Sequence, residues 1–185
     1  MDILLFGMQG SGKGTQAKIL AEKYNLKIFE MGAELRVMVK SGSDLGNRLK
    51  SIIESGNLVD DETIMEIVEN YLSGLSADDQ VLFDGIPRTL PQAKGLLDLL
   101  KQHGRQASAL YLDVSKEEVV KRMLLRGRDD DNHEVMEKRI GLFLEQTVPV
   151  INMFREQGNL VEVNGEQSLE AVTSEILEEA SHLFI

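Results

Sequence analysis

Short apolar runs alternate along the chain with longer stretches of helical periodicity. The apolar runs predict strands, and several of them are apolar on both faces, as strands buried in a parallel sheet are. They are Asp2–Phe6, Lys27–Phe29, Val81–Phe83, Ala109–Asp113 and Leu160–Val163. The alternation indicates βαβ units and an α/β fold with a doubly wound parallel sheet. Ligands of such sheets gather at the carboxyl ends of the strands.

The stretch between the second and third predicted strands is long for one crossover. It shows helical patterns over Met31–Lys40, Leu45–Glu54 and Thr63–Leu72. We interpret it as a small helical subdomain over the edge of the sheet, with a plain helical cover as the alternative.

The second half of the chain continues the alternation. Ser115 is placed to cap a helix that runs to Arg126, with Glu118 completing a capping box. Residues 127–133 are polar and charged and predict a short loop. A long helix is expected from Glu134, interrupted near Pro149, whose ring removes a helical donor. A final scaffold helix follows Ser168, with apolar positions at Leu169, Val172, Ile176 and Leu183.

Composition fits one compact domain with an acidic surface. The chain has 185 residues, of which 42% are hydrophobic and 28% charged. Its 20 Lys and Arg face 31 Asp and Glu, a formal charge of −11, which opposes binding to nucleic acid or to an anionic membrane. There is no cysteine, so disulfides and thiolate-bound zinc are excluded. Without a signal-peptide pattern or a long apolar span, we expect a cytoplasmic protein.

A glycine-rich stretch, Gly7–Thr15, follows the first predicted strand and precedes a helical pattern. Its glycines let successive backbone N–H groups point inward, and with the positive end of the helix they form a nest for phosphate oxygens. Lys13 adds a cation for the outer phosphates, and Thr15 offers a hydroxyl to Mg²⁺. A flexible glycine loop is the alternative, but glycines, lysine and hydroxyl all sit at working spacing.

The loop is a variant, because Gly14 separates the lysine from the hydroxyl. This form resembles that of the nucleoside monophosphate kinases, the adenylate kinase family above all. Three later stretches are similar to the same family and occur in its order: Gly32–Arg36, Asp84–Arg88 with Gln92, and Arg126–Arg128 followed by Asp130–Asn132 and Lys138–Arg139.

The resemblance implies a P-loop NTPase fold, a five-stranded parallel sheet flanked by helices. It also implies a helical monophosphate-binding insertion over residues 30–59 and a short lid over residues 127–133. The core would comprise residues 1–29, 60–126 and 134–185. The implied activity is reversible, Mg²⁺-dependent phosphoryl transfer from ATP to AMP, giving two ADP, in a monomer without structural zinc.

The resemblance also implies a set of site residues. ATP would be bound by Gly10, Ser11, Gly12, Lys13, Gly14, Thr15, Arg122, Arg126 and Gln167. AMP would be bound by Met31, Arg36, Asn57, Leu58, Val59, Gly85, Ile86, Pro87, Arg88, Gln92, Arg128 and Arg139. Lys13, Asp84, Arg88, Arg128 and Arg139 would serve catalysis, because arginine forks neutralise charge spread over several phosphate oxygens.

Asp84 follows a predicted strand beside the phosphate loop. A carboxylate there can orient Mg²⁺ through its waters, together with Thr15. A turn cap is the structural alternative. Arg105 and Arg155 match no motif and are interpreted as surface charges. The three histidines receive no catalytic role.

This chain departs from the family pattern at the acceptor side. Met31 and Ala33 stand where a hydroxyl and a carboxylate are expected, and Glu34 points about 100° away from its neighbour on a helix. Gln9 replaces a proline and Ile86 an aromatic residue. Another acceptor, CMP, UMP or dUMP, therefore stays open, as does a non-catalytic nucleotide sensor.

Overall fold

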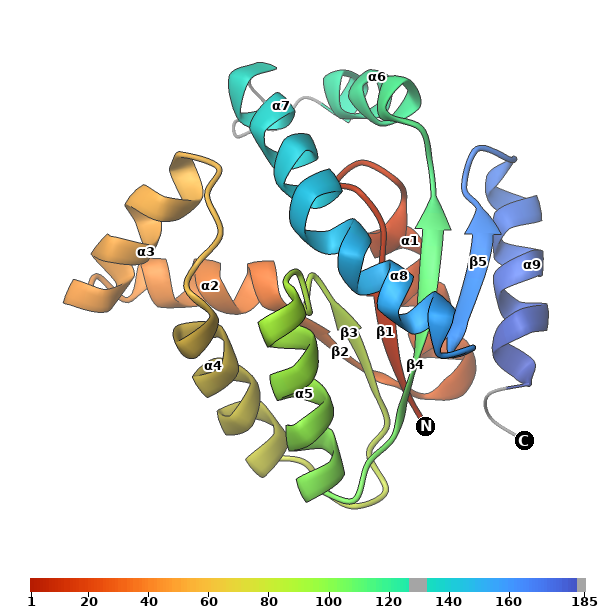
Figure 1. Ribbon diagram of the computed structural model, residues 1–185, viewed down its shortest axis with the longest axis horizontal. Helices are drawn as coiled ribbons and strands as arrows, with labels where there is room; N and C mark the ends of the chain where they lie inside the picture. The colour runs from red at the N-terminus through yellow and green to blue at the C-terminus, as the bar shows by residue number, and fades with distance from the viewer. Residues whose placement is uncertain (127–132, 183–185) are drawn as a thin grey trace.

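The computed structural model describes residues 1–126 and 133–182. Its sheet is parallel throughout, in the order β2-β3-β1-β4-β5 (Figure 1). The strands are β1 (Asp2–Phe6), β2 (Lys27–Glu30), β3 (Val81–Asp84), β4 (Ala107–Asp113) and β5 (Leu160–Asn164). The predicted five-stranded parallel sheet is confirmed, and its strand order is new information from the structure.

Helices cover both faces of the sheet. They are α1 (Lys13–Tyr24), α2 (Met31–Lys40), α3 (Asp44–Glu54), α4 (Asp61–Ser73), α5 (Leu90–Gln102), α6 (Lys116–Arg126), α7 (His133–Leu142), α8 (Val148–Glu156) and α9 (Leu169–Ser181). A π-helical turn, η1 (Phe143–Thr147), joins α7 to α8. Within the described ranges, no helix is both long and apolar enough to cross a membrane.

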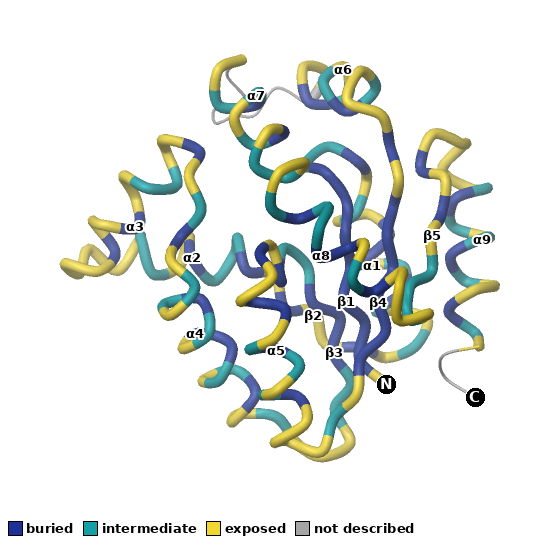
Figure 2. The backbone as a smooth tube through the Cα atoms, viewed as in Figure 1, coloured by how far each residue is buried: buried dark blue, intermediate teal, exposed yellow. Residues whose placement is uncertain are grey.

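The core has two layers because successive strand residues point to opposite faces. Leu4 and Phe6 of β1 pack with α4, α5 and α8, whereas Ile3 and Leu5 pack with α1, α6 and α9. One layer packs against each face of the sheet, and together they hold the strands in place. The carboxyl ends of the strands are therefore fixed relative to one another. Figure 2 shows the buried strands between helices whose outer faces are exposed.

Several element boundaries differ from the sequence prediction by one or two residues. Asp84 is the last residue of β3 rather than the first residue after it. The predicted capping box is only half formed, because the Ser115 hydroxyl accepts from the Glu118 N–H at 3.4 Å while the Ser115 N–H donates to Glu166 at 2.8 Å. The Glu118 carboxylate instead binds Lys121 and Arg122.

The interruption expected near Pro149 is the π-helical turn that precedes it. Pro149 has no N–H, and its ring crowds the carbonyl four residues back. The ladder widens there, and the Val148 N–H donates to the carbonyl of Phe143, five residues back. Of the apolar positions predicted for the last helix, Leu183 lies outside the described residues.

The interpretation of Arg105 as a surface charge is wrong. Its guanidinium binds both carboxylate oxygens of Asp2, at 2.7 and 2.6 Å, and the carbonyl of Asp79 at 2.6 Å. Asp2 is 2% exposed and also accepts from the Val81 N–H. The pair therefore joins β1 and β3 at the amino-terminal edge of the sheet. Arg155, in contrast, forms an exposed pair with Glu162 on β5.

Candidate active site

The glycine loop between β1 and α1 has a conformation that only glycine adopts without strain. Gly10 and Gly12 have φ of 92° and 103°. A Cβ on Gly10 would lie 2.7 Å from Cγ of Met123 on α6, so a side chain there would collide with the core. The loop is thus clasped between the start of α1 and the face of α6.

Two side chains of this loop, those of Ser11 and Lys13, indicate that it binds an anion. The Ser11 hydroxyl is the one buried side-chain polar atom without a hydrogen-bond partner in the described ranges. Lys13 turns its ammonium back onto the loop, donating to the carbonyls of Gly7 at 2.6 Å and Met8 at 2.9 Å. A buried hydroxyl and a lysine at the start of a helix are the groups that phosphate oxygens need.

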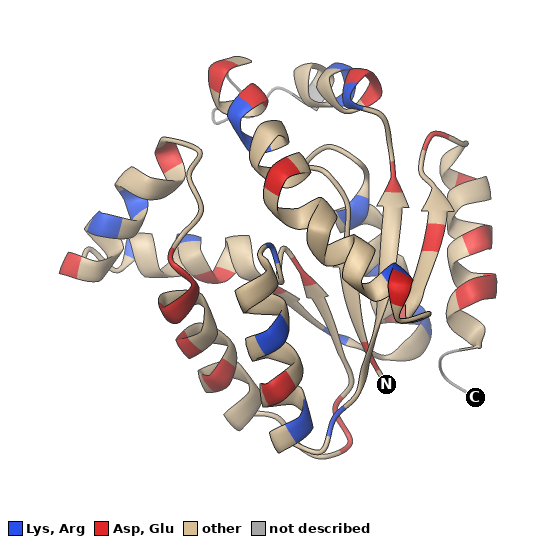
Figure 3. Cartoon of the chain, in the orientation of Figure 1, with Lys and Arg blue, Asp and Glu red and all other residues tan. Residues whose placement is uncertain are grey.

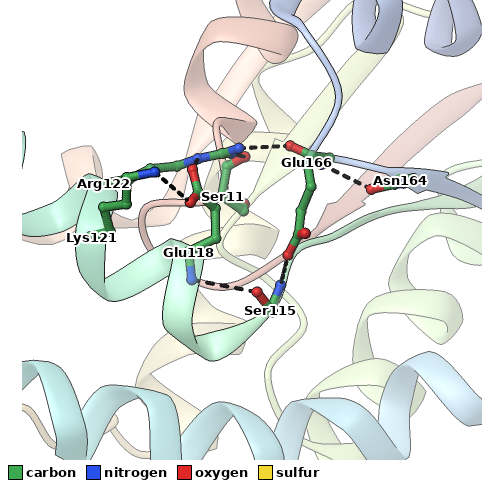
Figure 4. Close-up of polar contacts among 8 residues, drawn as sticks. Ser11, Ser115, Glu118, Lys121, Arg122, Asn164 and Glu166 are labelled. Atoms are coloured by element: carbon green, nitrogen blue, oxygen red, sulfur yellow. Dashed lines mark hydrogen bonds and ion pairs between the residues drawn. The ribbon is translucent and has the colours of Figure 1, made fainter.

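Arg122 of α6 joins the loop to the turn after β5. Its guanidinium donates to the Ser11 carbonyl at 3.1 Å and the Gly165 carbonyl at 3.0 Å, while Glu118 holds its Nε at 2.8 Å (Figure 4). The Gly165 turn is further fixed because Glu166 caps the start of α6 at Ser115. The two segments predicted to flank the donor nucleotide are therefore connected through one arginine.

Asp84 lies at the carboxyl end of β3, in register with Leu5 of β1 and Glu30 of β2. Burial raises the pKa of its carboxyl above the usual 3.8, while the nearby charges of Lys13 and Arg88 oppose that rise and Glu30 adds to it. No hydrogen-bond donor of the described residues reaches the carboxylate. A partly buried carboxylate that receives no hydrogen bond from these residues, beside a phosphate loop, can bind a hydrated divalent cation.

Arg88 is fixed by its own backbone as well as by its side chain. Its N–H donates to Gln92 at 2.8 Å, its carbonyl accepts from the buried Thr147 hydroxyl at 3.0 Å, and its Nε donates to the Gly85 carbonyl at 2.8 Å. The Arg88 side chain is exposed to solvent at its surface, but the protein atoms packed around it remove part of its hydration, which lowers its pKa. The charge of Asp84 raises that pKa, and the charge of Arg139 lowers it. The guanidinium nonetheless stays protonated at neutral pH.

Arg139 comes from α7 and reaches the phosphate loop. Its guanidinium donates to Oε1 of Gln9 at 3.0 Å. Two cations from different elements, Arg88 and Arg139, thus face the same region beside the loop, and the charge of Arg139 lowers the pKa of Arg88. Mutual repulsion between them would be relieved by a bound anion.

Gln92 is buried, and both ends of its amide have partners within the protein. Its oxygen accepts from the Arg88 N–H, and its nitrogen donates to Asp61 at 2.8 Å. Asp61 also accepts from the Thr89 hydroxyl at 3.0 Å. The amide nitrogen can donate twice and the oxygen can accept twice, so contact with an acceptor nucleotide does not require Gln92 to give up either of these partners.

Arg36 lies on α2, exposed, and its guanidinium is paired with Glu30 at 2.7 Å. A cavity of about 600 Å³ lies beside the carboxyl end of α3. It is lined by residues of α3, of the segment that leads into α4, and of α4, α7 and η1, together with Thr89: Ile52, Asn57, Leu58, Asp60, Asp61, Thr89, Leu142 and Gln146. Figure 3 shows Lys and Arg on α2 and α3 and acidic residues at the start of α4.

Some predicted site residues are buried or hydrogen-bonded to other protein groups, and others are not described. Met31 is 2% exposed and packs in the core, and Val59 and Ile86 are also buried. The Gln167 side chain donates to Glu175 and to the Asn164 carbonyl. Arg128 and most of the predicted lid lie outside the described residues, as does the side chain of Arg126.

The structure adds contacts that sequence reasoning missed. Thr147 supports Arg88 from 59 residues away, and Asp61 supports Gln92 from 31 residues away. Glu30 pairs with Arg36 across six residues, and Gln9 meets Arg139. Of these residues, only Thr147 stands in a recognisable local pattern, two residues before the helical Pro149. That pattern does not predict that Thr147 contacts Arg88.

Comparisons with known proteins agree with this geometry. The family model described as adenylate kinase matches residues 5–159. The chain is 39% identical to an adenylate kinase of Caulobacter sp. (strain K31), over 95% of this chain and 96% of that protein. It is 38% identical to an adenylate kinase of Leptospira biflexa (95% and 97% covered) and 35% identical to one of Phocaeicola vulgatus (96% and 96% covered).

Proposed function

The chain belongs to the adenylate kinase family, and from that premise we propose that it transfers a phosphoryl group reversibly from MgATP to AMP, giving two ADP. Membership makes it an enzyme of nucleotide phosphoryl transfer with the P-loop NTPase fold. The substrates and the roles of individual residues are our proposal.

One observation carries the proposal. The glycine loop with Lys13, the carboxylate of Asp84 and the guanidinium groups of Arg88 and Arg139 converge at the carboxyl edge of the sheet. They come from β1 and α1, from β3 and the turn after it, and from α7. Phosphoryl transfer needs this combination of positioned cations and backbone donors more than it needs a base.

On the donor side, the loop residues Gly10 to Thr15 would hold the β- and γ-phosphates of ATP with their N–H groups and the Ser11 hydroxyl. Lys13 would exchange its two carbonyl partners for phosphate oxygens, which are stronger acceptors for an ammonium. Arg122 would lie beside the donor base, opposite the turn that contains Gly165 and Gln167. Arg126 would contact the donor phosphates.

On the acceptor side, Arg36 and Arg88 would bind the phosphate of AMP, with Arg128 and Arg139 closing over the transferring group. Residues 30–59 would form the monophosphate-binding segment and residues 127–133 the lid. The cavity beside Asn57 and Leu58 suits the nucleoside, since Asp60 and Asp61 on its lining disfavour a phosphate there. Gly85–Pro87 would line the same acceptor.

The residues present fit a magnesium ion. Asp84 would hold it through water, and Thr15, exposed in the first turn of α1, would offer a hydroxyl. When bound with ATP, the ion neutralises phosphate charge. The protein's own part is to keep both nucleotides in line and to exclude water as its segments close, so that no covalent enzyme intermediate is needed.

The first test is ADP formation from MgATP and AMP by wild type and Lys13→Ala. We expect wild-type turnover and a loss of about 10²- to 10³-fold in the variant, since Lys13 acts on charge that develops in the transition state. CMP, UMP and dUMP are compared with AMP under the same conditions. A preference for a pyrimidine would replace AMP as the acceptor, and folded protein that binds ATP without turnover would overturn the proposal in favour of a sensor.

A further inference from the structure

The residue that pairs with Arg36 is placed by the sheet. Glu30 is the last residue of β2 and precedes the first residue of α2, where it makes no capping hydrogen bond with its side chain. Its backbone is in register with Asp84 of β3. The carboxylate therefore lies at the same carboxyl edge as the phosphate loop, on the side from which α2 and α3 extend (Figure 1).

The ion pair between Glu30 and Arg36 lies against the backbone of Gly32. Oε1 of Glu30 lies 2.7 Å from Nη2 of Arg36. A Cβ on Gly32 would lie 3.1 Å from Nη1 of Arg36 and 3.5 Å from Oε1 of Glu30, so both groups rest close to the backbone there. Both side chains are about half exposed, at 47% for Glu30 and 57% for Arg36, which leaves the pair accessible to a ligand from solvent.

A carboxylate and a phosphate compete for the same guanidinium fork. Both accept charge-assisted hydrogen bonds from an arginine in the same planar geometry. An acceptor phosphate that reaches Arg36 therefore competes with Glu30 for Nη2, and it meets the negative charge of that carboxylate even where it binds the other N–H groups. Neither effect requires any change in the rest of the fold.

We propose that Glu30 is an internal competitor of the acceptor: its carboxylate binds Nη2 of Arg36, places a negative charge beside the guanidinium and weakens the binding of a nucleoside monophosphate. This inference rests on the proposed function, in which Arg36 binds the acceptor phosphate. It assigns to Glu30 control of acceptor affinity. On the donor side, Lys13 and Arg122 have partners within the loop and its supports, and Glu30 acts there only through its charge near Asp84.

The test is Glu30→Gln, which keeps the size of the side chain and removes its charge. We expect the KM for AMP to fall about threefold to fivefold, as suits an exposed ion pair, and the KM for MgATP to change less, since Glu30 acts on that side only through its charge near Asp84. Glu34→Gln is the matched control, because it removes one negative charge from the first turn of α2, and Glu34 forms no ion pair among the described residues. Its KM for AMP should stay at the wild-type value.

Equilibrium titration with AMP, without ATP, gives the same answer independently of turnover. Tighter AMP binding by Glu30→Gln alone supports the proposal. Equal or weaker binding overturns it and makes Glu30 a support that orients Arg36. An equal gain in Glu34→Gln also overturns it, since the effect would then be general charge. Wild type without AMP turnover would refute the proposed function, whereas the titration would still decide the role of Glu30.

Discussion

The phosphate loop and residues 30–59, which we propose as the acceptor segment, meet at the carboxyl edge of the sheet but are supported very differently. The loop is tied by Lys13 to its own carbonyls, by Arg122 to the turn after β5, and by Arg139 to α7. In the acceptor segment, Met31 and Leu35 are the buried residues of α2, and Gly46 and Leu49 those of α3. Figure 2 shows most of α3 exposed.

The difference indicates what each region must do. Donors that stabilise developing charge work best when they are fixed before the reaction. A segment that closes over a substrate needs a small free-energy gap between its positions, and such segments have few buried apolar contacts. The phosphate loop, our proposed donor site, is therefore already held in place in this structure. In the proposed acceptor segment, Arg36 is instead paired with the carboxylate of Glu30.

The largest expected effect comes from deforming the fixed region. Gly10→Ala would force a side chain into Met123 at a φ of 92°, so the loop must shift. A shift of about 1 Å in a phosphate-binding loop costs about 10²-fold in kcat/KM for MgATP, measured by initial rates. Full activity would show that the loop is not preorganised.

Gly14→Ala is the control for stability, since nothing lies within 4 Å of a Cβ there and its φ is helical. We expect it to raise the free energy of unfolding by about 0.5–1 kcal/mol, where Gly10→Ala lowers it.

A second prediction removes the main anchor of α3. Leu49 is 1% exposed, and Leu49→Ala should cost about 2–5 kcal/mol at that site. If the acceptor segment opens by itself, amide hydrogen exchange should accelerate in α2 and α3 and stay unchanged in β1 and α1. Leu96→Ala on α5, fully buried in the same core layer, is the matched control and should accelerate exchange in β1 as well. Equal acceleration by both variants would erase the difference between the two regions.

A third prediction concerns Arg88, which follows β3 and which we propose binds the acceptor phosphate. Thr147→Val removes the hydroxyl that donates to the Arg88 carbonyl with little change in shape, and should raise the KM for AMP about fivefold. The KM for MgATP should not change. Thr147→Ser restores the hydroxyl and should restore the KM, a rescue that a purely packing role of the methyl group would not give.

The smallest expected effect is a gain in stability. Burial raises the pKa of Asp84, so its ionisation is less favourable in the folded than in the unfolded protein. The contribution of Asp84 to the stability of wild type therefore falls as pH rises from the ordinary carboxyl pKa of 3.8 through the raised folded value. Asp84→Asn avoids that loss and should melt slightly above wild type at pH 7 and equally near pH 3.5, although its turnover falls. Thermal unfolding against pH checks this, and a lower melting point at pH 7 would contradict it.

Sequence reasoning was strongest where local rules decide the structure. Strand alternation and apolar periodicity placed β1, α2 and the other strands of the parallel sheet to within a residue or two, and the glycine loop predicted a helix directly after it. It was weakest where a side chain chooses between distant partners. Arg105 and Arg155 look alike in the sequence, yet one forms a buried pair with Asp2 and the other an exposed pair with Glu162.

By itself, the sequence determined the fold class, the phosphate loop and the family, because backbone geometry and residue spacing act over a few positions. Only the tertiary structure decided the partners of the charged and polar side chains. It assigned Glu30 to Arg36, both ends of Gln92 to the protein, and Thr147 to Arg88. The contacts of Thr147 with Arg88 and of Asp61 with Gln92 depend on strand order and helix placement, because they join residues 59 and 31 positions apart. The pairing of Glu30 with Arg36 spans only six residues, but it depends on how β2 leads into α2, and no local rule specifies that geometry.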